Sequence, residues 1–205
     1  MTQPQMPTMP TVDTGAQPSA MPTQQPPHAQ QQGGNQNNSI KVIGRVNFPT
    51  TQLFEATGFI DISKQYPKSN AFLMFMPGQA DNTKLSGRTY LSNQSETMKI
   101  NIRDLFALAE AIKYAAMYKQ NPDFIIFTDS NKYAGTQQGQ GTTKKVTVTT
   151  MPSSKDPNKY KIFLTYNGQK KINLALDQWH AIGLAEELKS LATKVNEEKF
   201  AMEMN

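Results

Sequence analysis

The chain has 205 residues, a formal net charge of +5 and no cysteine. This composition excludes a disulfide framework and a zinc site built on thiolates, and no apolar run reaches the ~20 residues of a membrane-spanning helix. Residues 1–39 contain a single charged residue, Asp13, so the basic excess falls on the rest of the chain. A moderate basic excess suits a partner that carries phosphate, although many proteins without such a partner share it.

Residues 1–39 are rich in Gln, Pro, Thr and Asn. We expect a disordered tail, because this segment buries too little apolar surface to offset the entropy lost on ordering it. A passive leader, a spacer and a sticky low-complexity tail all fit the composition. The segment lacks a basic start followed by an apolar core, so we do not expect a secreted protein.

From Ile40 onwards, short apolar segments alternate with turns. The pattern predicts strands at residues 40–46, 54–63, 71–76, 88–93 and 97–102, with Pro77-Gly78 closing the third. A helix should follow, with Asp104 as its N-cap and an end near Lys119, before Asn121-Pro122.

Residues 144–194 predict three strands with two different faces, followed by a long helix that begins near Asp177. A strand at 124–128 and a glycine-rich loop at 133–143 precede them. Side chains alternate between the faces of a sheet, so one parity forms a core and the other faces solvent. The core parity holds Val146, Val148, Tyr160, Ile162, Leu164, Ile172 and Leu174. The solvent parity holds Lys145, Thr147, Thr149, Lys159, Lys161, Phe163, Thr165, Lys171 and Asn173.

The two halves of the chain match in order, which indicates an internal duplication. Residues 99–102 (KINI) match 171–174 (KINL) at an offset of 72, and residues 108–113 match 184–189 at an offset of 76. The difference is about one helical turn and suggests that the second helix starts a turn earlier. We place repeat 1 at about 40–120, repeat 2 at about 121–199 and a C-terminal tail at 200–205. Each helix should cover one face of its sheet and leave the other face free.

A ββββα unit that occurs twice resembles the Whirly proteins and, one unit at a time, the single-stranded-DNA-binding domain of the coactivator positive cofactor four. The likeness in residues covers 144–195, where KKVTVTTMP, KYKIFLTYN and KKINLALD precede a helix with apolar residues every three or four positions. The resemblance implies an α+β domain over 40–199, with two antiparallel four-stranded sheets packed with helices. It also implies a homo-oligomer, dimer or tetramer, and sequence-tolerant binding of single-stranded DNA.

The plant Whirly motif of alternating Lys-Gly-Lys and small residues has no counterpart here, since the aligned residues 71–76 are apolar. The short format with a tail suggests a bacterial or phage-encoded relative, which would work in the cytoplasm of the bacterium or of the infected host.

The predicted solvent faces supply lysines for phosphates and aromatic rings for bases. In repeat 2 we expect nucleic-acid contacts from Lys145, Thr147, Lys159, Lys161, Phe163, Thr165, Lys171 and Asn173. In repeat 1 we expect them from Lys99, Asn101, Arg103, Phe59, Arg88 and Tyr90. The competing interpretations are burial of Phe163 in an interface and an ordinary solvated lysine face. Phe163 has no sure equivalent in repeat 1.

Motifs of catalysis and metal binding are missing from the sequence. His28 and His180 have no cysteine to pair with, and no HExxH or DxDxDG pattern occurs. The loop at 135–144 lacks the GxxxxGK[ST] spacing of a phosphate-binding loop and leads into a strand. We therefore predict a non-catalytic protein without metal or cofactor. It would bind single-stranded DNA, or RNA, in replication, recombination or transcription. The alternative is a structural or assembly protein, such as a phage accessory component, that uses the same domain for self-association.

Overall fold

The computed structural model describes residues 39–63, 66–128, 143–153, 156 and 159–204. The tail predicted at 1–39, apart from Ser39, and most of the glycine-rich loop at 133–143 lie outside these ranges. Neither helix of the described ranges is long and apolar enough to cross a membrane.

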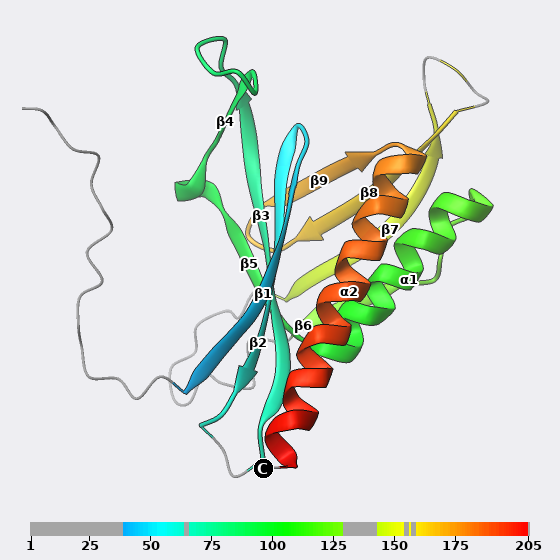
Figure 1. Ribbon diagram of the computed structural model, residues 1–205. Coiled ribbons are helices and arrows are strands. Elements are labelled where there is room, and N and C mark those ends of the chain that lie inside the picture. The colour runs from blue at the N-terminus through cyan, green and yellow to red at the C-terminus, as the bar shows by residue number, and fades with distance from the viewer. Residues whose placement is uncertain (1–38, 64–65, 129–142, 154–155, 157–158, 205) are drawn as a thin grey trace, which may run out of the picture. The chain divides into compact units, whose positions relative to one another are not determined.

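The strands of repeat 1 form an antiparallel sheet (Figure 1). They are β1 (Ile40–Pro49), β2 (Gln52–Asp61), β3 (Lys68–Ala80), β4 (Arg88–Tyr90) and β5 (Glu96–Asn101). β1, β2 and β3 are neighbours in that order. The other edge of β3 pairs with β5 along residues 70–75 and with the short β4 at residues 78–80. β3 is therefore long because it supports two partners one after the other.

The predicted close of the third strand at Pro77-Gly78 is wrong, since both residues lie inside β3. Pro77 stands opposite Gln52 in the last pair of the β2–β3 ladder, and the β4 pairing begins at the next residue. A proline is tolerated where a ladder ends, because no partner needs its missing N–H. The predicted strand at 88–93 is also too long. β4 ends at Tyr90, and residues 92–94 form a short 3-10 helix.

Repeat 2 forms a four-stranded antiparallel sheet in chain order. Its strands are β6 (Ile125–Thr128), β7 (Lys144–Pro152), β8 (Tyr160–Asn167) and β9 (Lys171–Leu176). The predicted core parity is buried, except that Tyr160 is half-buried at the start of β8. The predicted α+β class, with two antiparallel sheets built from tandem units and packed with helices, is confirmed.

Two helices follow the sheets, α1 (Ile102–Tyr118) and α2 (Gln178–Glu203). The side chain of Asn101 caps α1 by accepting a hydrogen bond from the N–H of Asp104 at 2.9 Å. The prediction of Asp104 as the cap is therefore wrong; both residue types cap well, and the chain turns three residues earlier. The predicted start of the second helix near Asp177 is confirmed, and the side chain of Asp177 caps α2 by accepting a hydrogen bond from the N–H of His180 at 2.9 Å. Residues 200–203, predicted to begin a tail, are the last turn of α2.

The two caps show how the repeats correspond. Asn101 and Asp177 are 76 residues apart (177 − 101), the same offset as the helix match. The helices therefore begin at equivalent points, and the idea that the second starts a turn earlier is wrong. The KINI and KINL segments are out of structural register by four residues: Lys171 begins β9, whereas Lys99 stands near the end of β5.

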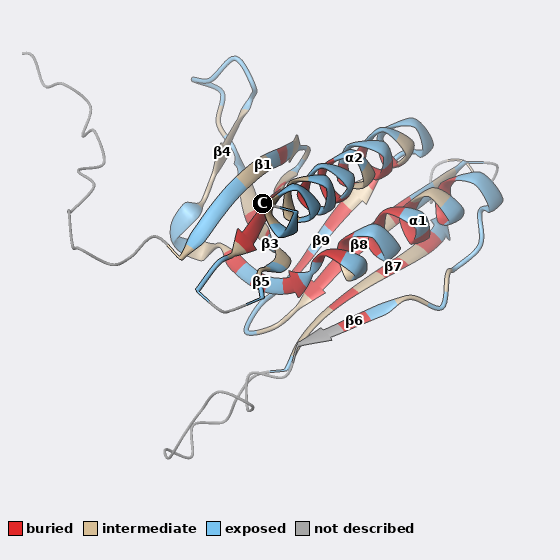
Figure 2. Ribbon diagram, turned by 60° about the horizontal axis from the view of Figure 1, so that its bottom comes forward, coloured by how far each residue is buried: buried red, intermediate tan, exposed pale blue. Residues whose placement is uncertain are grey.

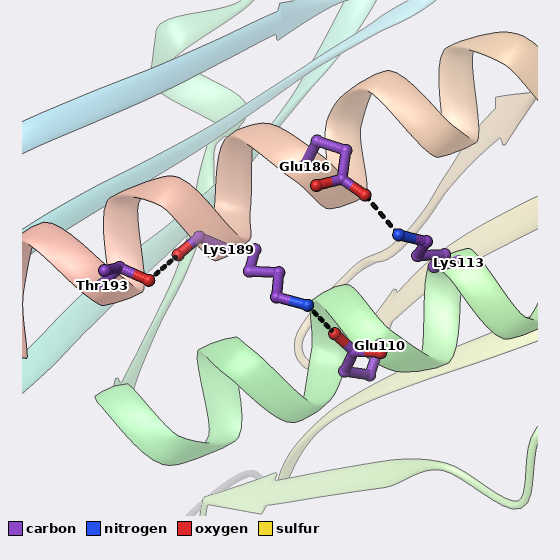
Figure 3. A network of polar contacts seen from close by, with 5 residues as sticks. All are labelled: Glu110, Lys113, Glu186, Lys189 and Thr193. Carbon is purple, nitrogen blue, oxygen red and sulfur yellow. Dashed lines mark hydrogen bonds and ion pairs between the residues drawn. The ribbon is translucent and has the colours of Figure 1, made fainter.

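α1 and α2 lie side by side and are joined by a reciprocal pair of ion pairs (Figure 3). Lys113 of α1 binds Glu186 of α2 at 2.5 Å, and Lys189 of α2 binds Glu110 of α1 at 2.7 Å. Glu110 and Glu186 are 76 residues apart, and so are Lys113 and Lys189. Exchanging the two repeats therefore turns one ion pair into the other. A two-fold relation between equal units produces this pattern. This symmetry in space supports the predicted duplication.

The buried residues gather where the helices face the sheets (Figure 2). α2 packs mainly on the sheet of repeat 1, whereas α1 contacts strands of both sheets. Two glycines permit this approach. A Cβ atom added at Gly44 would lie 3.1 Å from Leu191, and one added at Gly58 would lie 2.6 Å from Val195. The expectation that each helix covers its own sheet is wrong for α2, and the repeats are interlocked.

A buried hydrogen bond joins the two sheets inside this core. The hydroxyl of Tyr166 on β8 donates to the carboxylate of Glu96 on β5 at 3.0 Å. The ring of Tyr166 also packs against Phe75 of β3, with centroids 5.1 Å apart. Burial, and then the bond to Glu96, raise the pKa of Tyr166, so its hydroxyl keeps the proton that it donates.

We expect Gly58→Ala to lower the free energy of unfolding by about 1–3 kcal/mol, because the new methyl group would push α2 off the sheet. Urea denaturation measures the change. Gly183→Ala is the matched control: Gly183 is exposed on α2, with nothing within 4 Å of an added Cβ. It should raise stability by about 0.5–1 kcal/mol, since alanine favours helix over glycine. Equal stability of Gly58→Ala and the wild type would contradict the close approach of α2.

Candidate nucleic-acid interface

The outer face of the second sheet carries Phe163 near its centre. Phe163 is half-buried and stands opposite Thr149 on β7 and Ala175 on β9. A shallow depression of about 310 Å³ on this face is lined by Thr147, Thr149, Met151, Phe163, Thr165, Asn167, Lys171 and Asn173. The structure thus brings most of the residues predicted for repeat 2 onto one surface, as their parity requires. The predicted exposure of Thr165 is wrong, because its neighbours on β7 and β9 cover it and leave it 9% exposed.

The lysines of this face differ in their surroundings. Lys161 and Lys171 are exposed, and neither forms a hydrogen bond or ion pair with another described residue. Lys145 is half-buried. Lys159 precedes β8 and lies 3.7 Å from the carboxylate of Asp156, at the end of the sheet and not on its centre. Lys171 therefore lines the depression around Phe163, and Lys161 stands two residues from Phe163 along β8.

The outer face of the first sheet exposes Phe72, a residue that was not predicted. Phe59, which was, is fully buried: its ring stacks on Phe72 with centroids 4.6 Å apart and planes 18° apart. The ammonium of Lys99 lies 5.3 Å from the centre of the Phe59 ring and 3.9 Å from the carboxylate of Asp61. Phe72 is 38% exposed. Phe72, and not Phe59, can therefore offer a ring face to a ligand.

Two further residues predicted for repeat 1 lie near this face. Asn101 stands opposite Asn70 on β3, and Arg103 is exposed in the first turn of α1. Both line a cavity of about 650 Å³ at the end of the first sheet, together with Lys68 and Lys199.

Arg88 and Tyr90 lie apart from this group. Both belong to β4, which pairs with β3 beyond the β3–β5 ladder (Figure 1). The hydroxyl of Tyr90 donates to the carbonyl of Thr50 at 3.0 Å, which ties Tyr90 to the β1–β2 turn. The structure therefore places Lys99 beside Phe72 and places Asn101 and Arg103 at the cavity at the end of the sheet. It leaves Arg88 and Tyr90 elsewhere.

Phe72 and Phe163 occupy the same position in the two repeats. Phe72 stands opposite Lys99, and Phe163 stands opposite Ala175. Lys99 and Ala175 are 76 residues apart (175 − 99), the offset that relates the two helices. Thr57 and Thr149, on the other side of the two rings, correspond as well. Phe72 is thus the equivalent of Phe163 in repeat 1, and each sheet presents one phenylalanine ring on its outer face.

A signal for Phe72 exists in the sequence but is ambiguous. Phe72 alternates with the buried residues Ala71 and Leu73, which places it on the opposite face. However, residues 71–76 are apolar on both parities. Such a run does not reveal which parity is outward until the partner strands are known.

No protein-family model matches the sequence, and no curated protein matches it. Among solved structures, the chain is similar to the crystal structure of WHY1, a Whirly protein, from Arabidopsis thaliana. The identity is 10% and the TM-score is 0.48, with 74% of this chain and 91% of that chain covered. At this level of likeness, function has to be inferred from the residues of this chain.

Proposed function

We propose that the protein binds single-stranded DNA on the outer faces of its two sheets and catalyses no reaction. One observation carries the proposal: the exposed Phe72 and the half-buried Phe163 stand at equivalent positions of two duplicated faces. The helices occupy the inner faces, so these outer faces are free to take a ligand.

The chemistry of both faces suits an unpaired strand. Bases stack on aromatic rings for roughly 1–3 kcal/mol each, and any base can do so. Lys161 and Lys171 can lie against phosphates on the second sheet, as can Lys99 and Arg103 on the first. The surrounding threonine and asparagine side chains both donate and accept hydrogen bonds, which suits sequence-tolerant binding. A duplex hides the faces of its bases and offers nothing to these rings.

The alternative, a structural or assembly role through self-association, is supported by a different surface. Tyr114, Met117 and Tyr118 are exposed near the end of α1, and the two tyrosine rings lie 4.9 Å apart. Clustered exposed apolar side chains often mark contacts between proteins. We expect a homo-oligomer in either case, and DNA binding decides between the two functions.

Fluorescence anisotropy with labelled oligo-dT and with duplex DNA over a salt series tests the proposal. We expect micromolar or tighter binding to the single strand, with an affinity that falls steeply as salt rises. Phe72→Ala and Phe163→Ala should each weaken binding by about 5-fold or more, because each removes a stacking surface. Phe200→Ala, which removes an exposed ring from the last turn of α2, is the matched control and should bind normally. Equally weak binding to both DNAs would refute the proposal.

Phe59→Ala should lower the stability of the protein much more than Phe72→Ala does. Removal of the fully buried Phe59 ring should lower the free energy of unfolding by about 3–5 kcal/mol. Phe72→Ala should cost clearly less, because much of its ring already faces solvent. Urea denaturation of the two variants measures the difference. Equal losses would show that the two rings share one structural role and that Phe72 is not a free binding surface.

A further inference from the structure

A cavity that combines aromatic rings with lysines lies at the end of the second sheet. Its volume is about 340 Å³, and it lies between the end of α1, the start of β8 and the first turn of α2. The side chains that matter for its chemistry are Tyr160, Trp179, Lys119, Lys159 and Lys161. Trp179 is the chain's only tryptophan, and it is 79% exposed.

The charged groups around this cavity favour an anion with a flat ring. The ammonium of Lys119 lies 5.4 Å from the centre of the Tyr160 ring, and Lys161 has no partner among the described residues. Lys159 is 3.7 Å from the carboxylate of Asp156. Asp177, whose carboxylate is at the wall of the cavity, already accepts hydrogen bonds from the N–H and the ring of His180. Three ammonium groups thus stand beside an exposed indole.

Repeat 1 has a cavity in the equivalent place. The offset from Phe72 to Phe163 is 91 (163 − 72), and it also relates Lys68 to Lys159 and Asn70 to Lys161. The helix offset of 76 relates Arg103 to Trp179 (179 − 103). The cavity of repeat 1 is therefore cationic and rich in amides, whereas that of repeat 2 has an indole in place of the guanidinium. The duplication has left one site at the end of each sheet, and repeat 2 has gained a stacking surface there.

Lys161 connects the cavity to the outer face of the second sheet. It lies two residues from Phe163 on β8 and has the same parity. Two residues of a strand span about 7 Å. A DNA strand whose base stacks on Phe163 can therefore continue past Lys161 to the end of the sheet.

We propose that this cavity binds a nucleotide of the same strand, with its base stacked on Trp179 and its phosphate against Lys119 and Lys159. The inference rests on the proposed function and adds a subsite to it. The size fits, since small-ligand sites begin at about 300 Å³. An uncharged protein surface would leave the ammonium groups of Lys119 and Lys161 without counter-charge. An acidic peptide is the other occupant that an experiment must separate.

The emission of Trp179 reports on this cavity alone, because the chain has no other tryptophan. We expect unlabelled oligo-dT to quench this emission and to saturate at the same concentration as the anisotropy of a labelled oligonucleotide. Trp179→Ala should bind oligo-dT about fivefold or more weakly, and Trp179→Phe should restore most of the affinity. Phe200→Ala is the matched control: it removes an exposed ring from the far end of α2 and should change nothing.

The two readouts separate this inference from the proposed function. Anisotropy that shows binding, with unchanged emission and with normal affinity of Trp179→Ala, would overturn the subsite and leave the sheet faces as the binding surface. Absence of oligo-dT binding in anisotropy would overturn both. Quenching by a Glu-rich peptide but not by oligo-dT would assign the cavity to an acidic protein partner and would also overturn the inference.

Discussion

The close approach of α2 to the first sheet is the contact on which the rest of the structure depends. Gly44 and Gly58 have no side chain, so Leu191 and Val195 can reach the backbone of β1 and β2. A helix from repeat 2 thereby closes the core of repeat 1. The ion pairs between the helices are exposed and add little free energy by themselves, but their reciprocity shows that the helices pack about a two-fold relation. With both inner faces covered in this way, each sheet keeps one face for solvent.

The outer faces of the two repeats share the same strand pairing but carry different side chains at equivalent positions. The residue that corresponds to Phe59 in repeat 2 is Met151, because Thr57 and Thr149 correspond and each lies two residues earlier. In repeat 1 the Phe59 ring stacks against Phe72 on the same face of the sheet. In repeat 2 Met151 is exposed, and Phe163 lies in a shallow depression lined by threonines. The ends of the sheets differ in the same way, with Arg103 in one cavity and Trp179 in the other. Residues at equivalent positions thus make different contacts in the two repeats.

Buried polar groups restrict how the two sheets can be arranged. Tyr166 must find a partner for its hydroxyl inside the core, and Glu96 of the other sheet supplies it. An unpaired hydroxyl or carboxylate there would cost about 1–3 kcal/mol. This bond therefore disfavours sheet arrangements that separate β5 from β8.

Local patterns in the sequence were enough to determine the class of the fold and most of repeat 2. The alternation over residues 144–176 separates the two faces because one parity is apolar and the other polar, and Asp177 is a cap that acts on its own helix. The prediction of Asp104 as the first cap failed, because Asn101 accepts the same kind of hydrogen bond and stands three residues earlier. Only the tertiary structure decided that Phe72 faces outward, that β3 continues through Pro77, and that α2 covers the sheet of the other repeat. These outcomes depend on strand register and on contacts between residues more than 100 positions apart, such as Gly58 and Val195, and short-range periodicity carries no information about either.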